Sequence, residues 1–259
     1  MLVDLHNHTP LCKHADGTPE DYVKKAIATG TKYFGFSDHA PMRFDEEYRM
    51  DFSQMPLYET TVKGLKEKFY SDIEIFWGYE VDFLNSFIDN RVLERKVDYF
   101  IGSVHFLDSW GFDNPEFIGE YQNKNIDDIW KNYFKAVENM AKSGLFDIVG
   151  HIDLLKIFKY LPKTDIRVLS KSAISAIKKA NMTIEINTSG FRKPINEQYP
   201  SRAILEMAYE FDIPITFGSD AHEIEHIAYK SAEAEILARE CGYNACAIFL
   251  QRDRRLIKF

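Results

Sequence analysis

Three features are scarce or missing in this chain of 259 residues, and each absence excludes a class of protein. The cysteines Cys12, Cys241 and Cys246 are odd in number and unrelated in spacing, so they predict neither a disulfide framework nor a zinc finger. No apolar run approaches the roughly 20 residues of a membrane span. The opening MLVDLHNHTP lacks the basic segment and apolar core of a signal peptide. We therefore expect a soluble protein of the reducing cytoplasm.

A run of basic residues is also absent. The net charge is −8, from 32 basic and 40 acidic residues, and no run of lysine or arginine stands out. A nucleic-acid partner is therefore not expected. The hydrophobic share of 45% and the charged share of 28% are ordinary for a globular protein, and there is no linker, repeat or low-complexity tract. We expect residues 1–259 to form a single domain; the oligomeric state cannot be inferred.

Seven short runs rich in β-branched and aromatic residues are typical of buried strands. They cover residues 2–6, 33–37, 73–81, 99–104, 148–151, 183–187 and 214–218. Helical patterns lie between them: Thr18 should cap a helix that ends near Gly30, and Asn125 should cap a helix that ends at Gly144. Three further helices are expected over 166–180 (capped by Thr164 or Asp165), 202–211 and 225–242.

The alternation of strand and helix predicts a parallel sheet in an α/β fold. Seven repeats in this length favour a (β/α)7 TIM-like barrel over the alternative, a doubly wound open sheet. The tail 247–259 is expected to add a last, irregular strand.

Histidines follow the predicted strands. All but His226 lie at the C-terminal end of a strand or in the loop after it, as do Glu80 and Asp220; the seven are His6, His8, His14, His39, His105, His151 and His222. The C-terminal ends of barrel strands meet at one rim, where active sites are built. Any one histidine there is more often a hydrogen-bonded structural residue, but the gathering of seven predicts a shared site.

Imidazole and carboxylate are good ligands for zinc, manganese and iron. His6 and His8 lie two apart on an extended segment, so both rings can face one cation. Asp38 and Asp153 are expected to orient neighbouring ligands; the alternative is that each caps the next helix. The sequence therefore predicts a metal site at the rim.

The motifs HNHT, SDHA, GYEVDF, GSVHF, GHIDL, EINTSG and GSDAH, with a further histidine after HNHT, resemble those of the PHP (polymerase and histidinol phosphatase) family. The likeness runs from Leu2 to about His222. The segments VHFLDSWGFDNPEF and LFDIVGHIDLLKIF resemble its monofunctional histidinol-phosphatase branch. The resemblance implies a distorted (β/α)7 barrel that holds three divalent metal ions, whether zinc, iron or manganese.

Matching positions imply three ligand sets. The first contains His6, His8, Glu80 and Asp220; in the second, Glu80 bridges to His105 and His151; the third contains His14, His39 and His222. The implied reaction is hydrolysis of L-histidinol phosphate to L-histidinol and phosphate, a step of histidine biosynthesis. Glu80, Asp220 and His222 are the expected catalytic residues, with Asp220 or His222 moving a proton towards the leaving alcohol.

The alternative within the family is a phosphoesterase that acts on nucleotides or nucleic-acid ends. It should show a basic groove or a stacking platform. Two other classes are a metal-binding scaffold, which should have lost ligands, and an amidohydrolase, which often needs a lysine at a strand end. Neither sign is present.

The phosphate group should meet a cationic side chain. Arg192 and Lys193 directly follow the strand at 183–187, and Arg43 follows His39. The long segment 107–124 is expected to form a rim loop, whose Asp108 and Asp113 are candidates to face a cationic amine.

Overall fold

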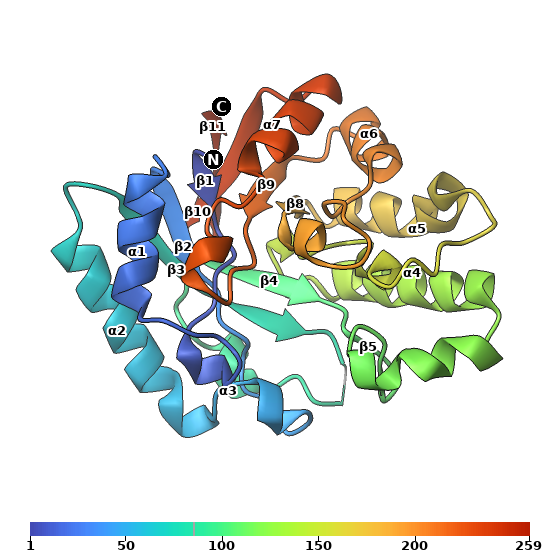
Figure 1. Cartoon of the computed structure of the whole chain (residues 1–259), viewed down its shortest axis with the longest axis horizontal. Coiled ribbons are helices and arrows are strands. Elements are labelled where there is room, and N and C mark those ends of the chain that lie inside the picture. Colours follow the sequence, from blue (N-terminus) through green and yellow to red (C-terminus); the bar gives the residue numbers. More distant parts are fainter. Residues whose placement is uncertain (85) are drawn as a thin grey trace.

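Seven parallel strands form the centre of the molecule in the computed structural model, which describes residues 1–84 and 86–259 (Figure 1). Their order in the sheet is β1-β2-β3-β4-β7-β8-β9, and every neighbouring pair is parallel. The strands are β1 Val3–Asp4, β2 Tyr33–Phe36, β3 Glu74–Asp82, β4 Tyr99–Ser103, β7 Ile148–Val149, β8 Thr183–Asn187 and β9 Ile215–Gly218.

The first and last strands of this sheet lie side by side, so the sheet forms a nearly closed barrel. The backbone nitrogen of Leu5 donates to the carbonyl of Phe217 at 2.9 Å, and that of Asp220 donates to the carbonyl of His6 at 2.7 Å. The predicted (β/α)7 barrel is therefore confirmed, and the open doubly wound sheet is excluded.

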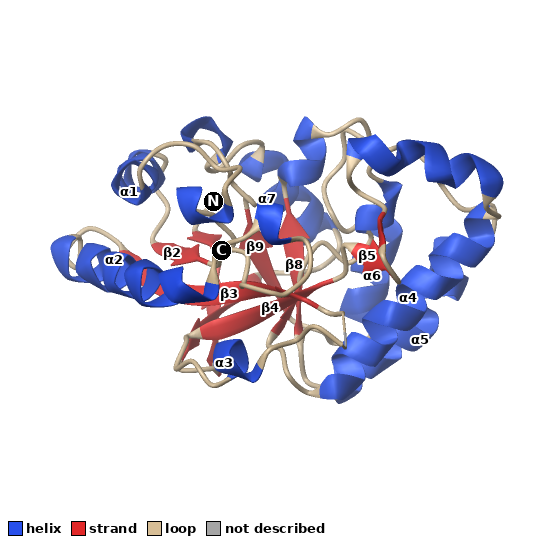
Figure 2. Cartoon of the chain, turned by 90° about the horizontal axis from the view of Figure 1, so that it is seen from below, coloured by secondary structure: helices blue, strands red, loops and turns tan. Residues whose placement is uncertain are grey.

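A helix follows each of the seven strands, and these helices cover the outside of the sheet (Figures 1 and 2). They are α1 Pro19–Ala28, α2 Met55–Lys68, α3 Asn90–Leu93, α4 Ile126–Ser143, α5 Ile166–Lys179, α6 Arg202–Glu210 and α7 Ser231–Glu240. The barrel is distorted because α3 is a single turn, and because a small hairpin of β5 Phe106–Leu107 and β6 Trp110–Gly111 precedes α4. None of these helices is long and apolar enough to cross a membrane.

The expected helix caps are present. The side chain of Thr18 accepts a hydrogen bond from the nitrogen of Asp21, and that of Asn125 accepts from Asp127 and Asp128 at the start of α4. Of the two candidates before α5, Asp165 is the cap. Gly144 ends α4 in the left-handed conformation, as glycine does most readily.

The last helix and the tail differ from the prediction. The helix expected over 225–242 begins only at Ser231, because Ala228 and Lys230 have positive φ and interrupt it. The tail is not one irregular strand but an antiparallel hairpin, β10 Ala245–Leu250 and β11 Asp253–Lys258. Gln251 and Arg252 both adopt positive φ, which is the geometry of a two-residue hairpin turn.

This C-terminal hairpin closes the end of the barrel where the strands begin. Arg252 donates a backbone hydrogen bond to the carbonyl of Asp98, just before β4, and its side chain binds Asp147, just before β7. Apolar hairpin side chains such as Ile248 and Phe249 belong to the buried cluster that fills this end. The opposite end, where the strands finish, is thus left for the polar residues.

Candidate metal centre

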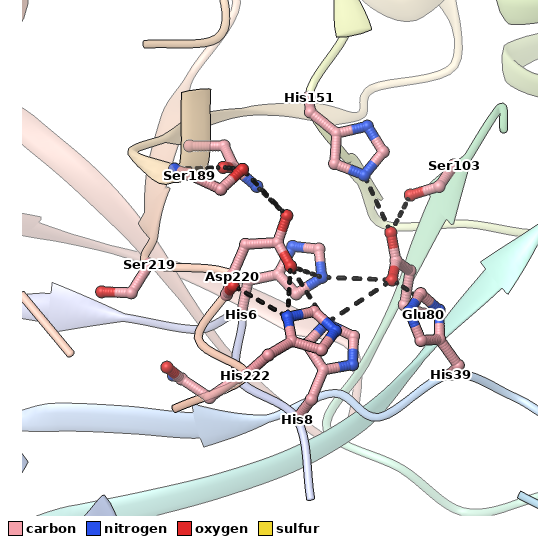
Figure 3. A network of polar contacts seen from close by, with 12 residues as sticks. His6, His8, His39, Glu80, Ser103, His151, Ser189, Ser219, Asp220 and His222 are labelled. Carbon is pink, nitrogen blue, oxygen red and sulfur yellow. Dashed lines mark hydrogen bonds and ion pairs between the residues drawn. The ribbon is translucent and has the colours of Figure 1, made fainter. Parts of the chain in front are cut away.

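Figure 3 shows His6, His8, His39, His151 and His222 of the predicted rim meeting where the strands end. The rings of His14 and His105 lie beside them, with centroids 5.3 Å and 5.9 Å from that of His39. His6 and His8 follow β1, His39 follows β2, Glu80 lies near the end of β3, and Asp220 follows β9. Residues more than 200 positions apart therefore face each other within one buried cluster.

Glu80 lies at the middle of this cluster. Its Oε1 accepts hydrogen bonds from Ser103 Oγ at 2.6 Å and from His151 Nε2 at 2.9 Å. Its Oε2 lies 2.9 Å from His39 Nδ1 and 3.3 Å from His6 Nε2. One carboxylate thus faces rings from both sides, which is the geometry that a bridging ligand needs.

Asp220 lies opposite Glu80. Its Oδ1 is 3.2 Å from His8 Nε2 and 3.9 Å from His6 Nε2. Its Oδ2 accepts hydrogen bonds from Asn187 Nδ2 at 3.2 Å and from Ser189 Oγ at 3.1 Å. These two donors hold the carboxylate so that its other oxygen points to the histidines.

A third group of rings lies nearer the mouth. The ring of His222 stacks on those of His8 and His14, with centroids 4.0 Å and 4.6 Å away, and His14 lies 5.3 Å from His39. His14 Nδ1 donates to the carbonyl of Cys12, and His222 Nδ1 donates to that of Asp220. Since a carbonyl can only accept, both rings carry the proton on Nδ1, and the lone pair of Nε2 is available to a metal ion.

Ligand atoms converge in sets. Within each set the atoms lie within 4.8 Å of one another, and the sets are His6–His8–Glu80, Glu80–His105–His151, His14–His39–His222 and His8–Cys12–His222. The first three contain the residues of the sets implied by the family resemblance, with the exception of Asp220. Asp220 is not a member of the first set at this distance, although its Oδ1 lies 3.2 Å from His8 Nε2. The fourth brings in Cys12, whose thiol keeps its proton because burial raises its pKa.

Two histidines and both central carboxylates have protonation states that suit metal binding. Burial lowers the pKa of His39 to about 4, and burial together with the neighbouring His8 ring lowers that of His222 well below its ordinary value. Burial alone would raise the pKa values of Glu80 and Asp220, but the surrounding imidazoles outweigh it and lower both. His39 and His222 are therefore neutral, whereas burial of His6 and His8 is outweighed by the neighbouring carboxylates, which raise both pKa values. Glu80 and Asp220 are ionised.

His105 is held by another carboxylate. Its Nδ1 lies 2.6 Å from Asp82 Oδ1, and its Nε2 lies 3.7 Å from Glu80. Burial opposes a charge on this ring, but Asp82 outweighs it and raises the pKa of His105 to about 10. Arg49, itself buried, donates to the other oxygen of Asp82 at 2.9 Å. Asp82, itself held by Arg49, therefore fixes the orientation of the His105 ring.

Several buried polar atoms in the cluster have no hydrogen-bond partner in the described residues. They are His6 Nε2, His8 Nδ1 and Nε2, His39 Nδ1, Glu80 Oε2, His151 Nδ1 and His222 Nε2. Leaving such atoms unpaired costs folding free energy, on the order of 1–3 kcal/mol each. Divalent cations among them would satisfy the nitrogen and oxygen lone pairs, so this donor set fits such ions.

The cluster opens into a cavity of about 540 Å³. Arg192 and Lys193 line it, as the sequence predicted for a phosphate contact. Arg192 Nη2 donates to the carbonyls of Ser219 and Asp220, whereas its buried Nη1 has no partner in the described residues. Arg43 is exposed and is not among the lining residues, so its contact with phosphate stays a prediction.

The lining of the cavity also includes acidic and apolar side chains. Asp113 lines it, as do Asp45 and Glu223, whereas Asp108 is exposed and lies outside the lining. The apolar lining is contributed by Phe106, Pro115, Phe117, Leu154 and Ile157. A ligand that carries both a cationic and an apolar part would find a complementary surface for each.

Other polar residues around the cluster escaped the sequence analysis. Glu185 contacts His6 at 2.6 Å, and Asp82 and Arg49 hold His105. The signal for Glu185 was present, since Glu185 and Asn187 are polar residues two apart in a buried strand and so share a face. Arg49 offered none.

The two aspartates expected to orient ligands behave differently. Asp38 Oδ1 lies 3.4 Å from His8 Nδ1 and accepts from the nitrogen of His39, so it contacts two of the clustered residues. Asp153 instead accepts from the nitrogen of Ser201 and pairs with Lys156.

Comparison with known proteins identifies what this arrangement is similar to. The PHP domain family profile matches residues 4–189. A probable histidinol-phosphatase of Deinococcus radiodurans is 37% identical over 93% of this chain and 94% of its own length. The histidinol-phosphatase of Bacillus subtilis is 29% identical over 87% of this chain and 95% of its own length.

Among solved structures, a histidinol phosphate phosphatase of Lactococcus lactis has a similar fold, with a TM-score of 0.79 and 23% identity over 98% of both chains. That structure is a complex with zinc, L-histidinol and phosphate.

Proposed function

This chain belongs to the PHP domain family, and from that premise we propose that it is a histidinol-phosphatase, which hydrolyses L-histidinol phosphate to L-histidinol and phosphate. The observation that carries the proposal is the convergence of the three ligand sets around Glu80 at the mouth of the barrel. The similarity to the Deinococcus relative supports the choice of substrate, since it extends over nearly the whole of both proteins.

We further propose how the ligands are divided among three divalent ions. His6, His8, Glu80 and Asp220 would hold one ion; Glu80, His105 and His151 the second; His14, His39 and His222 the third. The ligand set suits zinc, iron and manganese alike. When bound, these cations would neutralise the phosphate dianion. They would also lower the pKa of water at the site, so that hydroxide becomes available to attack phosphorus near neutral pH.

The residues of this chain would then position the ester. Arg192 lines the cavity, and its Nη1 has no hydrogen-bond partner in the part of the chain that the structure describes. Its Nη2 is held by two carbonyls, which would keep the guanidinium in place for the phosphate oxygens. Lys193 would add a second positive charge at the same wall. Asp220 or His222 would pass a proton to the leaving alcohol, since both stand at the cavity wall beside the cluster.

The rest of the cavity fits the histidinol part of the substrate. We propose that Asp113 faces the substrate amine, because a carboxylate in a recessed site favours a cation. The apolar side chains Phe106, Leu154 and Ile157 would cover the imidazole ring. The acidic side chains of the lining would repel a polyphosphate chain, so the cavity favours a small cationic ester over a nucleotide or a nucleic-acid end.

The whole chain is proposed to act as one PHP-type phosphoesterase domain, 1–259. The profile ends at residue 189, but Asp220 and His222 complete the ligand sets, and the C-terminal hairpin closes the barrel base. A cytoplasmic location is proposed because Cys12, Cys241 and Cys246 are all free and buried, which suits a reducing compartment.

The test is hydrolysis of a panel of phosphate esters by the purified protein, before and after treatment with a chelator. We expect preferred turnover of histidinol phosphate, its loss on metal removal, and its recovery when zinc, iron or manganese is returned. Preferred turnover of nucleotides, or turnover that survives complete metal removal, would contradict the proposal.

A further inference from the structure

Glu185 is a buried carboxylate that belongs to none of the three ligand sets. It lies in β8, its side chain is 1% exposed, and both of its oxygens are used. Oε1 lies 2.6 Å from Nδ1 of His6. Oε2 accepts from the backbone nitrogen of His151 at 2.9 Å and from Asn187 Nδ2 at 3.0 Å.

These contacts reach three strand ends. His6 follows β1, His151 follows β7, and the Nδ2 of Asn187 also donates to Asp220 Oδ2 after β9. Gly218 leaves the space in which Glu185 sits, because a Cβ at that position would contact the Glu185 carboxylate and the Cβ of His6. One side chain of β8 thus touches, directly or through one amide, residues of two different ligand sets.

We propose that Glu185 is a positioning residue of the metal centre, an inference that rests on the proposed function. By accepting from Nδ1–H, it fixes the His6 tautomer and leaves Nε2 directed at Glu80 and Asp220. An imidazole that donates to a carboxylate is also a more basic ligand. Through Oε2, the same carboxylate keeps His151 in register with His6.

The other rings supply a contrast within the same site. His14 and His222 donate Nδ1–H to neutral carbonyls, of Cys12 and Asp220. A carbonyl fixes the tautomer but adds less basicity than a carboxylate. The set His14–His39–His222 therefore binds its ion more weakly than the set that contains His6, and it does not depend on Glu185.

The first experiment measures the dissociation constant for zinc of full-length protein by competition with a coloured chelator. In Glu185→Gln, the amide NH2 replaces one acceptor oxygen and so faces another donor. That donor is either His6 Nδ1–H, or the backbone nitrogen of His151 together with Asn187 Nδ2. We expect the tightest zinc site to weaken by about 10–100-fold, while the weakest stays unchanged.

Asp98→Asn is the matched control. Asp98 is also buried, at 4% exposure, and its two oxygens accept from the backbone nitrogens of Gln251 and Trp77, both at 3.1 Å. The amide meets the same conflict between donors, but at the opposite end of the barrel. We expect Asp98→Asn to lower thermal stability and to leave zinc affinity unchanged.

A second measurement needs no variant. In zinc-loaded wild-type protein, two-dimensional nitrogen–proton NMR of the imidazoles should show His6 with its proton on Nδ1, in a strongly hydrogen-bonded and therefore downfield position. A His6 proton on Nε2, or tightest-site zinc affinity in Glu185→Gln equal to that of wild type, would overturn the role of Glu185 while leaving the phosphatase proposal intact. A wild-type protein that binds no zinc, iron or manganese would overturn both.

Discussion

Replacing Gly218 by alanine tests how tightly the metal centre is packed from behind. The added Cβ would lie 2.6 Å from the Cβ of His6, closer than real Cβ contacts allow, and 3.1 Å from Cδ of Glu185, tighter than most such contacts. Gly218 does not have a positive φ, so the strain is purely steric. Neither neighbour can retreat freely, because His6 and Glu185 are both buried and hydrogen-bonded to each other.

Overpacking of this kind costs about 1–3 kcal/mol of folding free energy. For a domain of this size each kcal/mol lowers Tm by about 2–4 °C, so Gly218→Ala should lower Tm by roughly 2–12 °C. It should also weaken zinc binding, because the His6 ring must move to make room. Thermal unfolding followed by circular dichroism, together with zinc competition, measures the two effects.

Gly64→Ala is the matched control. Gly64 lies on the exposed face of α2, and a Cβ there would meet no atom within 4 Å. Removing a glycine from a helix should stabilise the protein by up to about 1 kcal/mol without changing zinc affinity. The reasoning would be refuted if Gly218→Ala matched the wild type in both Tm and zinc affinity.

Three further outcomes are expected. Arg192→Ala should lower kcat/KM on histidinol phosphate by roughly 10–100-fold, the loss of a charged hydrogen bond of about 1.5–3 kcal/mol. Arg167→Ala should not, because Arg167 is half-buried and outside the cavity lining; kinetics of Arg192→Ala equal to those of the wild type would contradict the phosphate contact. Asp113→Asn should raise KM for histidinol phosphate more than KM for p-nitrophenyl phosphate, which has no amine, and equal changes would contradict the amine contact. Burial raises the pKa of Cys246 to about 12, so its thiolate forms only near that pH. At pH 8 a disulfide reagent should therefore label the Cys246 thiol only after the protein unfolds. Rapid labelling of Cys246 in the native protein would contradict its burial.

The rim of ligands was predictable from the sequence because it depends on local signals. A histidine directly after a buried strand lies at the strand's C-terminal end whatever the strand pairs with, and a parallel barrel collects those ends. His6, His39 and Asp220 were placed by this argument alone. The division into three sets needed the family resemblance, since strand ends give a common mouth but no distances.

What the sequence could not supply depends on partners distant in the chain. Arg49 binds Asp82 from a loop whose path has no local signal. The helix α2 escaped notice because its sequence, MPLYETTVKGLKEK, contains a glycine and β-branched residues that weaken the helical pattern. The C-terminal hairpin was misjudged because its turn uses Gln251 and Arg252 at positive φ, where glycine or asparagine is the usual signal.

The pairing of β1 with β9 has a consequence for how a cell makes this protein. Leu5 and Phe217 join the two edges, although they lie more than 200 positions apart in the chain. A chain still on the ribosome can fold its early strands, but His6 and His8 have no Asp220 or His222 to face until residue 222 has been made. The cluster can therefore be complete only after translation has passed residue 222, and a fragment that stops before β9 would lack both Asp220 and His222.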